Sequence, residues 1–254
     1  MIARRSAEEL QKLRRAGLVV AEVLRRVGED VRPGRSTWDL EEVADGVLRE
    51  REATSAFRGY KGFPCVLCVS VNEQVIHGIP SRKRILAAGE IVSLDCGVVV
   101  DGYYADHATT CVVGAPEQVP ERVRKLMEAT RLALAEAIEQ ARVGQRLGDI
   151  SHAVEERAQR EGFSVVREFV GHGIGTHLHE DPQVPNFGRA GTGPKLRAGM
   201  VLAIEPMINL GAPEVRVQAD GWTAVTADGN PSAHFEHTVA ITDAGPWILT
   251  RPEA

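Results

Sequence analysis

The 254-residue sequence predicts an α+β fold made of two similar halves, approximately residues 1–115 and 116–254. Helix-like patterns precede strand-like patterns in the first half, and the same order repeats in the second. No low-complexity linker separates the halves, so we expect one domain over residues 1–254 with internal pseudo-symmetry. Hydrophobic residues make up 43% and charged residues 26%, which is typical of a globular chain with a sizeable core.

Two helices are predicted at the start of the chain. Ser6 and Glu9 have the spacing of a capping box, and leucine and valine residues follow at helical intervals. A Pro33-Gly34 break ends this first helix. Ser36 or Thr37 can cap the second helix. Its apolar face comprises Leu40, Val43, Val47 and Leu48.

Strand-like runs follow between residues 54 and 113, where short β-branched stretches are divided by glycine, proline and asparagine. These stretches read CVLCVSV, EIVSLDCGVVV and ATTCVVG. A long helix is predicted over residues 120–141, and a shorter one over residues 148–162. From residue 164 the pattern is strand-like again, in VVREFV, GMVLAIEPMINL, GWTAVTA and AHFEHTVAIT.

Five residues with metal-binding side chains stand in apolar surroundings. Three of the carboxylates interrupt the runs IVSLDCGVVV, MVLAIEPMINL and HFEHTVAIT. A buried carboxylate must be neutralised, hydrogen-bonded or placed on a cation. Four carboxylates match the charge of two divalent cations, and one added imidazole gives the donor set of a two-metal hydrolase. The five residues are Asp95, Asp106, His172, Glu205 and Glu236.

The two aspartates are predicted to share one face of a β-hairpin. Asp101 and Gly102 form a strong signal for a two-residue turn. Such a turn places Asp95 opposite Ala108, with Asp106 diagonally across on the same face. A solvent-facing pair of carboxylates is the alternative, but the apolar neighbours favour a metal pair.

The second half supplies the other three residues. Glycines on both sides of His172 leave its imidazole accessible. Pro206 forces an extended backbone at Glu205 and ends regular pairing there, which suits a carboxylate that points into a cleft. Taken singly, Glu205 or Glu236 could instead form a buried salt bridge with an arginine.

A CxxC sequence at Cys65 and Cys68 raises the possibility of a zinc or redox site. In a strand-like run, however, positions i and i+3 point to opposite faces. Cys96 and Cys111 do not form a second CxxC. We therefore expect ordinary packing, or one cysteine that lines a pocket.

The composition argues against two classes of partner. The net charge of −5 gives no overall basic field for nucleic acid. No apolar run reaches the ~18 residues of a membrane span, and the N-terminal segment lacks a hydrophobic stretch of signal-peptide type. With only four cysteines, these features predict a cytoplasmic protein without membrane association.

Through nearly its whole length the sequence resembles the type I methionine aminopeptidases, in their short bacterial form. The resemblance implies the pita-bread (creatinase/aminopeptidase) fold, in which two pseudo-symmetric halves form a curved antiparallel sheet with helices outside. The motifs that carry it are NE at 72–73, HGIP at 77–80, the Asp95 to Asp106 interval, GHGIG at 171–175, HEDPQV at 179–184, IEPM at 204–207, DGWT at 220–223 and FEHT at 235–238.

The resemblance implies two divalent metal ions, with Co, Mn, Fe or Zn all compatible with the donors. Asp106 and Glu236 would bridge both ions, Asp95 would hold one, and His172 with Glu205 would hold the other. It also implies a monovalent cation held mostly by backbone oxygens. That cation would lie near Asn72, Gln74 and Ser232.

The implied reaction is removal of the initiator methionine from nascent proteins and peptides, with preference for a small second residue. Glu205 is the expected general base. His179 would stabilise the oxyanion, and His77 would orient the scissile amide. Peptide N-termini, with transient ribosome contact, are the expected partners of a monomeric enzyme that does not read nucleic-acid sequence.

The resemblance also implies a methionine pocket. Its residues would be Tyr60, Phe63, Cys68, His77, Leu178 and Trp222. Three positions depart from the family pattern. Phe63 stands where a second tyrosine is frequent, Leu178 where an aromatic is frequent, and His107 where a small hydroxyl residue is usual. The metal-type residues are all present, so we expect these departures to change the shape of the pocket and not the chemistry.

Two other functions compete with this interpretation. An Xaa-Pro peptidase of the same fold usually carries a long N-terminal domain, whereas only a short helical segment precedes the strands here. A non-catalytic pita-bread binding module typically loses metal ligands, and all five are present in this sequence.

Overall fold

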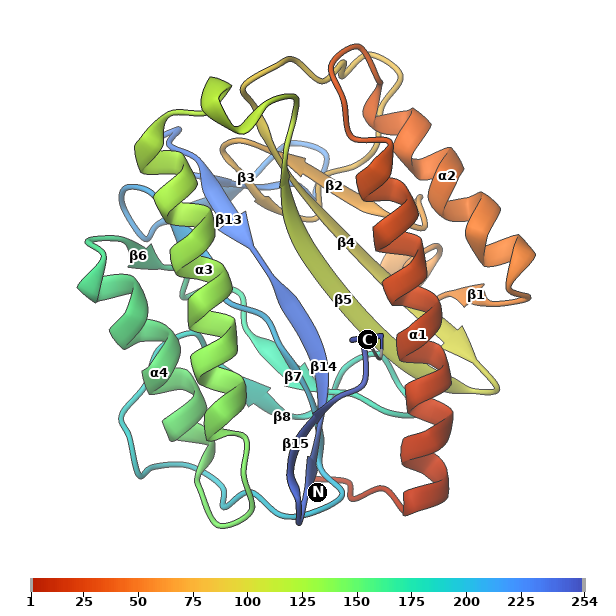
Figure 1. The fold of residues 1–254 in the computed structure, drawn as a ribbon, viewed down its shortest axis with the longest axis vertical. Coiled ribbons are helices and arrows are strands. Elements are labelled where there is room, and N and C mark those ends of the chain that lie inside the picture. Colours follow the sequence, from red (N-terminus) through yellow and green to blue (C-terminus); the bar gives the residue numbers. More distant parts are fainter. Residues whose placement is uncertain (1, 253–254) are drawn as a thin grey trace.

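The computed structural model describes residues 2–252, and it contains a strongly curved antiparallel sheet flanked by two pairs of helices (Figure 1). The N-terminal pair and the later pair lie on opposite sides of the view, with the strands between them. None of the helices in the described residues is long and apolar enough to cross a membrane. The helices are α1 (Ala7–Glu29), α2 (Thr37–Glu50), α3 (Glu121–Gln140) and α4 (Leu147–Arg160), with 3-10 turns at Tyr60–Gly62 and Pro116–Gln118.

The main sheet has nine strands and takes them from both halves of the chain. Seven follow the order β1-β4-β5-β14-β9-β7-β8, while β2 pairs with β4 and β15 pairs with β14. Their bounds are β1 (Thr54–Ser55), β2 (Cys68–Val71), β4 (Ile91–Val100), β5 (Tyr103–Val112), β7 (Gly171–Gly173), β8 (Glu180–Val184), β9 (Val201–Ile204), β14 (Glu236–Thr242) and β15 (Gly245–Ile248).

Two small sheets complete the fold, in the orders β13-β10-β6 and β11-β12-β3. Their strands are β3 (Gln74–Ile76), β6 (Ser164–Val165), β10 (Met207–Asn209), β11 (Val215–Val217), β12 (Ala224–Thr226) and β13 (Ser232–His234). The predicted α+β class with a curved antiparallel sheet is confirmed.

Side-chain caps explain where the first two helices begin. Ser6 accepts a hydrogen bond from the Glu9 backbone, and Glu9 returns one to the Ser6 backbone, as the predicted capping box requires. Of the two residues predicted to cap the second helix, Ser36 is the N-cap, and it forms a capping box with Asp39. The predicted helices at 120–141 and 148–162 form within two residues of those bounds.

The β4–β5 hairpin has the predicted register. Asp101 and Gly102 both adopt positive φ, at 51° and 79°, as the tight turn requires. Asp95 lies opposite Ala108, and Asp106 lies opposite Gly97, so the two aspartates are diagonal neighbours on one face.

Side-chain hydrogen bonds join the two halves next to these aspartates. β5 and β14 pair through only two residue pairs. The Asp106 backbone N–H donates to the Thr238 hydroxyl at 3.0 Å, and that hydroxyl donates to the Asp106 carbonyl at 2.8 Å. The Thr110 hydroxyl makes a similar pair of bonds with the His234 backbone. Because these contacts cross between the halves, the halves are fixed where the metal-type residues lie.

Among the predicted strands that differ from the structure, two lead directly to site residues. The run AHFEHTVAIT divides at Phe235, because β13 joins one of the small sheets while β14 joins the main sheet. The run VVREFV forms a strand only over Ser164–Val165. Glu236 is therefore the first residue of β14, and residues 166–170 lie outside any strand before β7 begins at Gly171.

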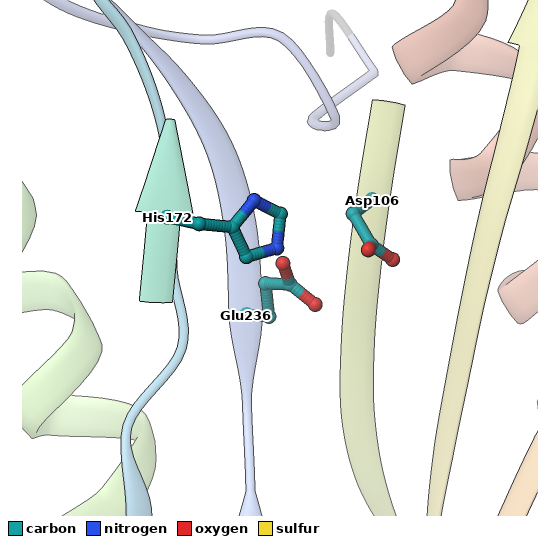
Figure 2. Close-up of side chains that lie close together, drawn as sticks. All are labelled: Asp106, His172 and Glu236. Atoms are coloured by element: carbon teal, nitrogen blue, oxygen red, sulfur yellow. The ribbon is translucent and has the colours of Figure 1, made fainter. Parts of the chain in front are cut away.

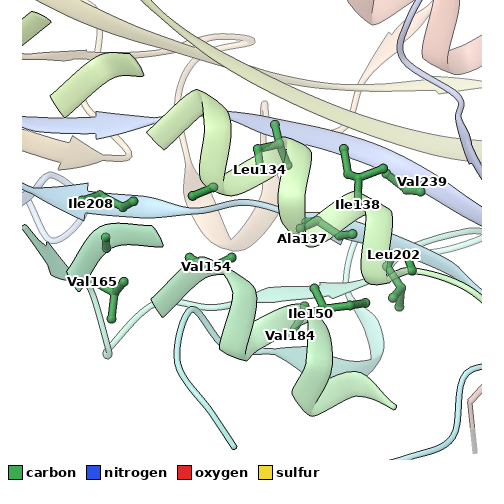
Figure 3. Packing of buried hydrophobic residues seen from close by; sticks show 14 of the residues in the cluster. Leu134, Ala137, Ile138, Ile150, Val154, Val165, Val184, Leu202, Ile208 and Val239 are labelled. Carbon is green, nitrogen blue, oxygen red and sulfur yellow. The ribbon is translucent and has the colours of Figure 1, made fainter. Parts of the chain in front are cut away.

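Each helix pair covers its own apolar core. In the second half, α3 and α4 pack against β9 and β14 (Figure 3). Residues fully buried in this cluster include Ala137, Ile150, Leu202, Ile208 and Val239. A separate cluster beneath α1 and α2 contains Val20, Leu40, Val47, Val92 and Leu94.

Two helix glycines allow a matched stability test. A Cβ at Gly17 would lie 2.2 Å from the Leu249 carbonyl oxygen, whereas a Cβ at Gly46 meets nothing within 4 Å. We expect Gly17→Ala to lower the free energy of unfolding by about 1–3 kcal/mol, since overpacking outweighs its gain in helix propensity. Gly46→Ala should raise it by about 0.5–1 kcal/mol. Urea unfolding of both variants measures this, and equal effects would contradict the packing of α1 on the C-terminal segment.

Candidate active site

A cavity of about 180 Å³ lies where the two halves meet. All five metal-type residues line it, as do all six residues of the predicted methionine pocket. The volume is below the ~300–1,000 Å³ typical of sites for drug-sized ligands, so the cavity suits a group the size of one amino-acid residue. The other lining residues are Phe57, Lys61, Ile76, Phe169, Val170 and His179.

Three of the metal-type side chains form a tight group (Figure 2). Ligand atoms of Asp106, His172 and Glu236 all lie within 4.8 Å of one another. They come from β5, β7 and β14, so strands of both halves contribute. Glu205 follows β9 and brings Oε1 to 3.5 Å from His172 Nε2. Asp95 reaches the same cavity from β4.

The electrostatics of this group favour a cation. Burial raises the pKa of Asp106 to about 7, and burial together with the Asp106 charge raises the pKa values of Asp95, Glu205 and Glu236 well above their usual range. Asp95 Oδ1 and Glu236 Oε1 are buried with no hydrogen-bond partner among the described residues. Buried carboxylate oxygens without donors are the ligands that a divalent cation would satisfy.

His172 is held in the form that can bind a metal. Its Nδ1 lies 2.9 Å from the Gly173 carbonyl oxygen, which can only accept, so Nδ1 carries the proton. Nε2 therefore presents its lone pair toward Glu205. Burial, and then the neighbouring His179, lower the pKa of His172 to about 3, so the ring stays neutral.

Two further histidines, His77 and His179, line the same cavity. His77 has a left-handed backbone with φ 59°, an uncommon conformation for a residue with a side chain. Burial lowers the pKa of His77 to about 4. His179 Nδ1 lies 2.9 Å from the Tyr60 hydroxyl, and its ring centroid is 4.2 Å from that of His172. The burial of His179 also lowers its pKa.

Aromatic rings form the apolar part of the cavity. Phe63 and Trp222 meet edge to face at 5.1 Å, and His77 meets Phe169 at 5.6 Å. The sequence prediction missed Phe169, although its place two residues before the GHGIG motif was an available signal. Leu178 and Cys68 complete this wall.

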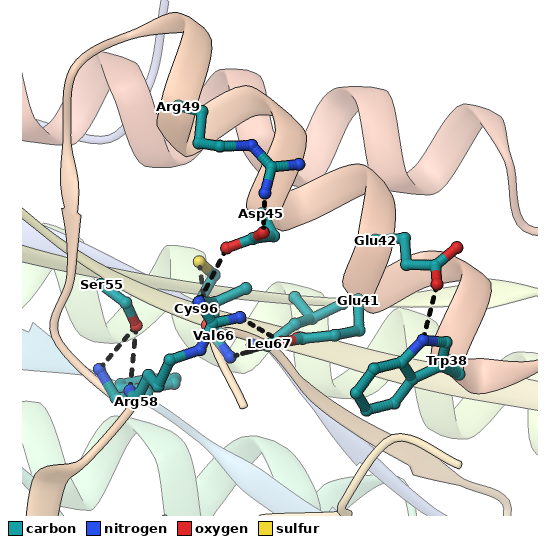
Figure 4. Close-up of polar contacts among 11 residues, drawn as sticks. Trp38, Glu41, Glu42, Asp45, Arg49, Ser55, Arg58, Val66, Leu67 and Cys96 are labelled. Atoms are coloured by element: carbon teal, nitrogen blue, oxygen red, sulfur yellow. Dashed lines mark hydrogen bonds and ion pairs between the residues drawn. The ribbon is translucent and has the colours of Figure 1, made fainter. Parts of the chain in front are cut away.

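A buried carboxylate supports the loop that carries Tyr60 and Phe63 (Figure 4). Glu41 on α2 accepts hydrogen bonds from the backbone N–H groups of Val66 and Leu67 at 2.9 Å. It also accepts one from Arg58 at 3.0 Å. These donors explain how an acidic side chain with 2% exposure is tolerated, even though burial raises its pKa.

A second polar clamp supports the loop that carries Leu178 and His179. Arg5 donates to both carboxylate oxygens of Glu180. Glu180 in turn accepts from the backbone N–H groups of Thr176 and His177. The N-terminal segment therefore fixes one wall of the cavity from outside it.

The remaining positions singled out in the sequence lie as follows. His107 points away from the cavity, where its Nδ1 donates to the Glu236 carbonyl and its ring stacks on His237 at 4.5 Å. Both cysteines of the CxxC are buried and free, and only Cys68 lines the cavity. This agrees with the expectation of packing together with one pocket-lining cysteine.

Comparisons with known proteins identify the family of this chain. The chain matches metallopeptidase family M24 over residues 11–243. It is 50% identical to methionine aminopeptidase of Clostridium perfringens over 98% of this chain and 99% of that protein. It is 46% identical to methionine aminopeptidase 1 of Bacillus subtilis over 99% and 100% of the two chains.

Solved structures extend the comparison. A crystal structure of methionine aminopeptidase from Thermotoga maritima superposes with a TM-score of 0.97 at 46% identity, covering 99% of this chain and 100% of that one. Prolidase from Pyrococcus furiosus shares the fold alone, with a TM-score of 0.77 at 22% identity over 99% of this chain and 66% of that one. The chain therefore belongs to metallopeptidase family M24 and, within it, to the methionine aminopeptidases.

Proposed function

We propose that this protein is an aminopeptidase that removes the initiator methionine from nascent proteins and peptides. The observation that carries the proposal is one residue-sized cavity that is lined both by the metal-type cluster and by a group of aromatic rings. A methionine side chain is flexible and apolar, and its sulfur makes favourable contacts with aromatic rings such as those of Phe63 and Trp222. A peptide N-terminus in this cavity therefore places its first peptide bond beside the cluster.

We infer that two divalent cations occupy the cluster, held by Asp95, Asp106, His172, Glu205 and Glu236. Two divalent charges balance four carboxylates, and they satisfy the buried oxygens that have no donor. When bound, such ions polarise the scissile carbonyl and lower the pKa of water toward neutrality. Oxygen donors with one imidazole are compatible with Mn, Fe, Co or Zn. A monovalent cation near Asn72, Gln74 and Ser232 remains a further expectation.

Glu205 is the proposed general base. It is the carboxylate that lies beside His172 just after the end of β9, at the edge of the cluster where an attacking water can reach it. It takes a proton from the attacking water and passes that proton to the nitrogen of the leaving amine. The peptide C–N bond then breaks, releasing methionine and the shortened chain.

The two neutral histidines are proposed to act on the substrate amide. If the Tyr60 hydroxyl donates to His179 Nδ1, the ring proton lies on Nε2, which can donate to the scissile carbonyl oxygen. His77 is held in its strained backbone conformation between that carbonyl region and Trp222. From there it orients the scissile amide.

The size of the cavity is consistent with the expected preference for a small second residue. We further propose that the substrates are free N-termini in the cytoplasm, reached through transient contact with the ribosome by a monomeric enzyme. Recognition of nucleic-acid sequence has no part in this proposal.

Peptide assays test the reaction. We expect methionine release from Met-Ala-Ser, because one apolar cavity adjoins the cluster, and no cleavage of Ala-Pro. Removal of divalent metal with a chelator should abolish release, and added Mn²⁺ should restore it. Mass spectrometry of the products measures both. Preferred cleavage of Ala-Pro would support an Xaa-Pro peptidase, and metal binding without cleavage of either peptide would support a non-catalytic module.

Replacement of the proposed base gives a second test. Glu205→Gln keeps an oxygen that can contact a cation but cannot accept the proton of water. We expect kcat for Met-Ala-Ser to fall by roughly 10²–10⁴-fold while most of the metal stays bound. Glu214→Gln, at an exposed position, is the matched control and should leave kcat unchanged. Near-wild-type turnover by Glu205→Gln would show that the base is assigned wrongly.

A further inference from the structure

One lining residue of the cavity is basic and has no role in the chemistry above. Lys61 is exposed and lies at the mouth, whereas the carboxylates lie at depth. Its backbone is left-handed, with φ 48°, between Gly59 at 87° and Gly62 at 91°. Few side-chain-bearing residues adopt this conformation, so the turn sets the direction in which Lys61 leaves the loop.

Contacts connect Lys61 to the proposed oxyanion-binding residue. The Lys61 ammonium lies 5.4 Å from the centroid of the Tyr60 ring, within range of a cation–π interaction. The Tyr60 hydroxyl is hydrogen-bonded to His179, and the two rings stack at 5.3 Å.

The charge of Lys61 is not balanced by a carboxylate. No acidic side chain in residues 2–252 forms an ion pair with it. The nearby Arg58 differs, because Glu41 and Asp45 both pair with it, at 3.0 and 2.9 Å (Figure 4). Among the residues that the structure describes, Lys61 is the one lysine or arginine that lines the cavity. Its charge is therefore available to a ligand.

The path of a substrate brings it past this charge. With the first side chain in the apolar part of the cavity and the first peptide bond at the cluster, the following residues must leave through the mouth. An extended peptide advances ~3.3 Å per residue. Because the cavity has room for about one amino-acid residue, the third residue lies outside it, near the mouth. The four carboxylates of the cluster could repel an acidic group on the substrate. In the active enzyme, however, these carboxylates are buried and their charge is balanced by cations.

We propose that Lys61 is a specificity-determining residue that favours substrates with a carboxylate at the third position. This inference rests on the proposed function, and it adds a substrate class to it: Met-small-acidic N-termini. The pair would be exposed to solvent, and exposed ion pairs have modest strength, so the expected preference in kcat/KM is about two- to fivefold at low salt. It should decrease as ionic strength rises.

A set of matched peptides tests the proposal. Met-Ala-Glu-Ser, Met-Ala-Gln-Ser and Met-Ala-Lys-Ser, all with amidated C-termini, differ only in the charge of the third side chain. The free-acid form of the glutamine peptide separates the effect of a terminal carboxylate. The wild-type protein should prefer the glutamate peptide, Lys61→Gln should lose the preference, and Lys61→Glu should prefer the lysine peptide.

A charge reversal elsewhere serves as the control. Lys195 is exposed and does not line the cavity, so Lys195→Glu should keep the wild-type order of peptides. If Lys61→Glu keeps the wild-type order, the assignment of Lys61 is overturned while the aminopeptidase function stands. If the wild-type protein releases no methionine from any of the peptides, both proposals are overturned.

Discussion

Mutual repulsion of buried carboxylates is the constraint on which the rest of this structure depends. Asp95, Asp106, Glu205 and Glu236 line one small cavity at the meeting point of two halves. Without a cation, burial and the neighbouring charges raise the pKa values of these carboxylates, so protons would have to neutralise them in place of metal ions. A fold that brings these groups together gains little stability from them, and their arrangement is explained by the cations it can hold.

Hydrogen bonds hold the strands that carry the carboxylates in place, where β5 of the first half meets β14 of the second. The Thr238 hydroxyl fixes the backbone of Asp106, and the ring of His107 fixes the backbone carbonyl of Glu236. The loops that form the other wall are clamped from a distance by Glu41 and by Arg5. Each clamp is a buried or partly buried polar contact. Such a contact fixes the geometry of the loop, but it costs more desolvation free energy than apolar packing would.

The sequence predicted those features that local rules control. An Asp-Gly turn and a side-chain period of two determine which residues face each other across a hairpin, so the pairing of Asp95 with Ala108 followed from Asp101 and Gly102. Charge balance then predicted that the carboxylates belong together, and the resemblance of the motifs predicted the pocket residues; the structure places both groups around one cavity.

Other features depend on contacts between distant segments. Alternation along a strand does not say which sheet the strand joins, so the division at Phe235 was not foreseen. Phe169 lines the cavity only because β6 ends early, and nothing in the local sequence links Glu41 to Val66 or Arg5 to Glu180. These are tertiary contacts, for which short-range patterns carry no signal.

The central claim is that the carboxylate cluster exists to hold two divalent cations. Anomalous diffraction from crystals grown with Mn²⁺ tests it most directly. The account predicts two peaks about 3.5–4 Å apart, in contact with Asp106 and Glu236 and with the other three residues around them. A cavity with no peak, or peaks bound only by residues outside this group of five, would contradict it.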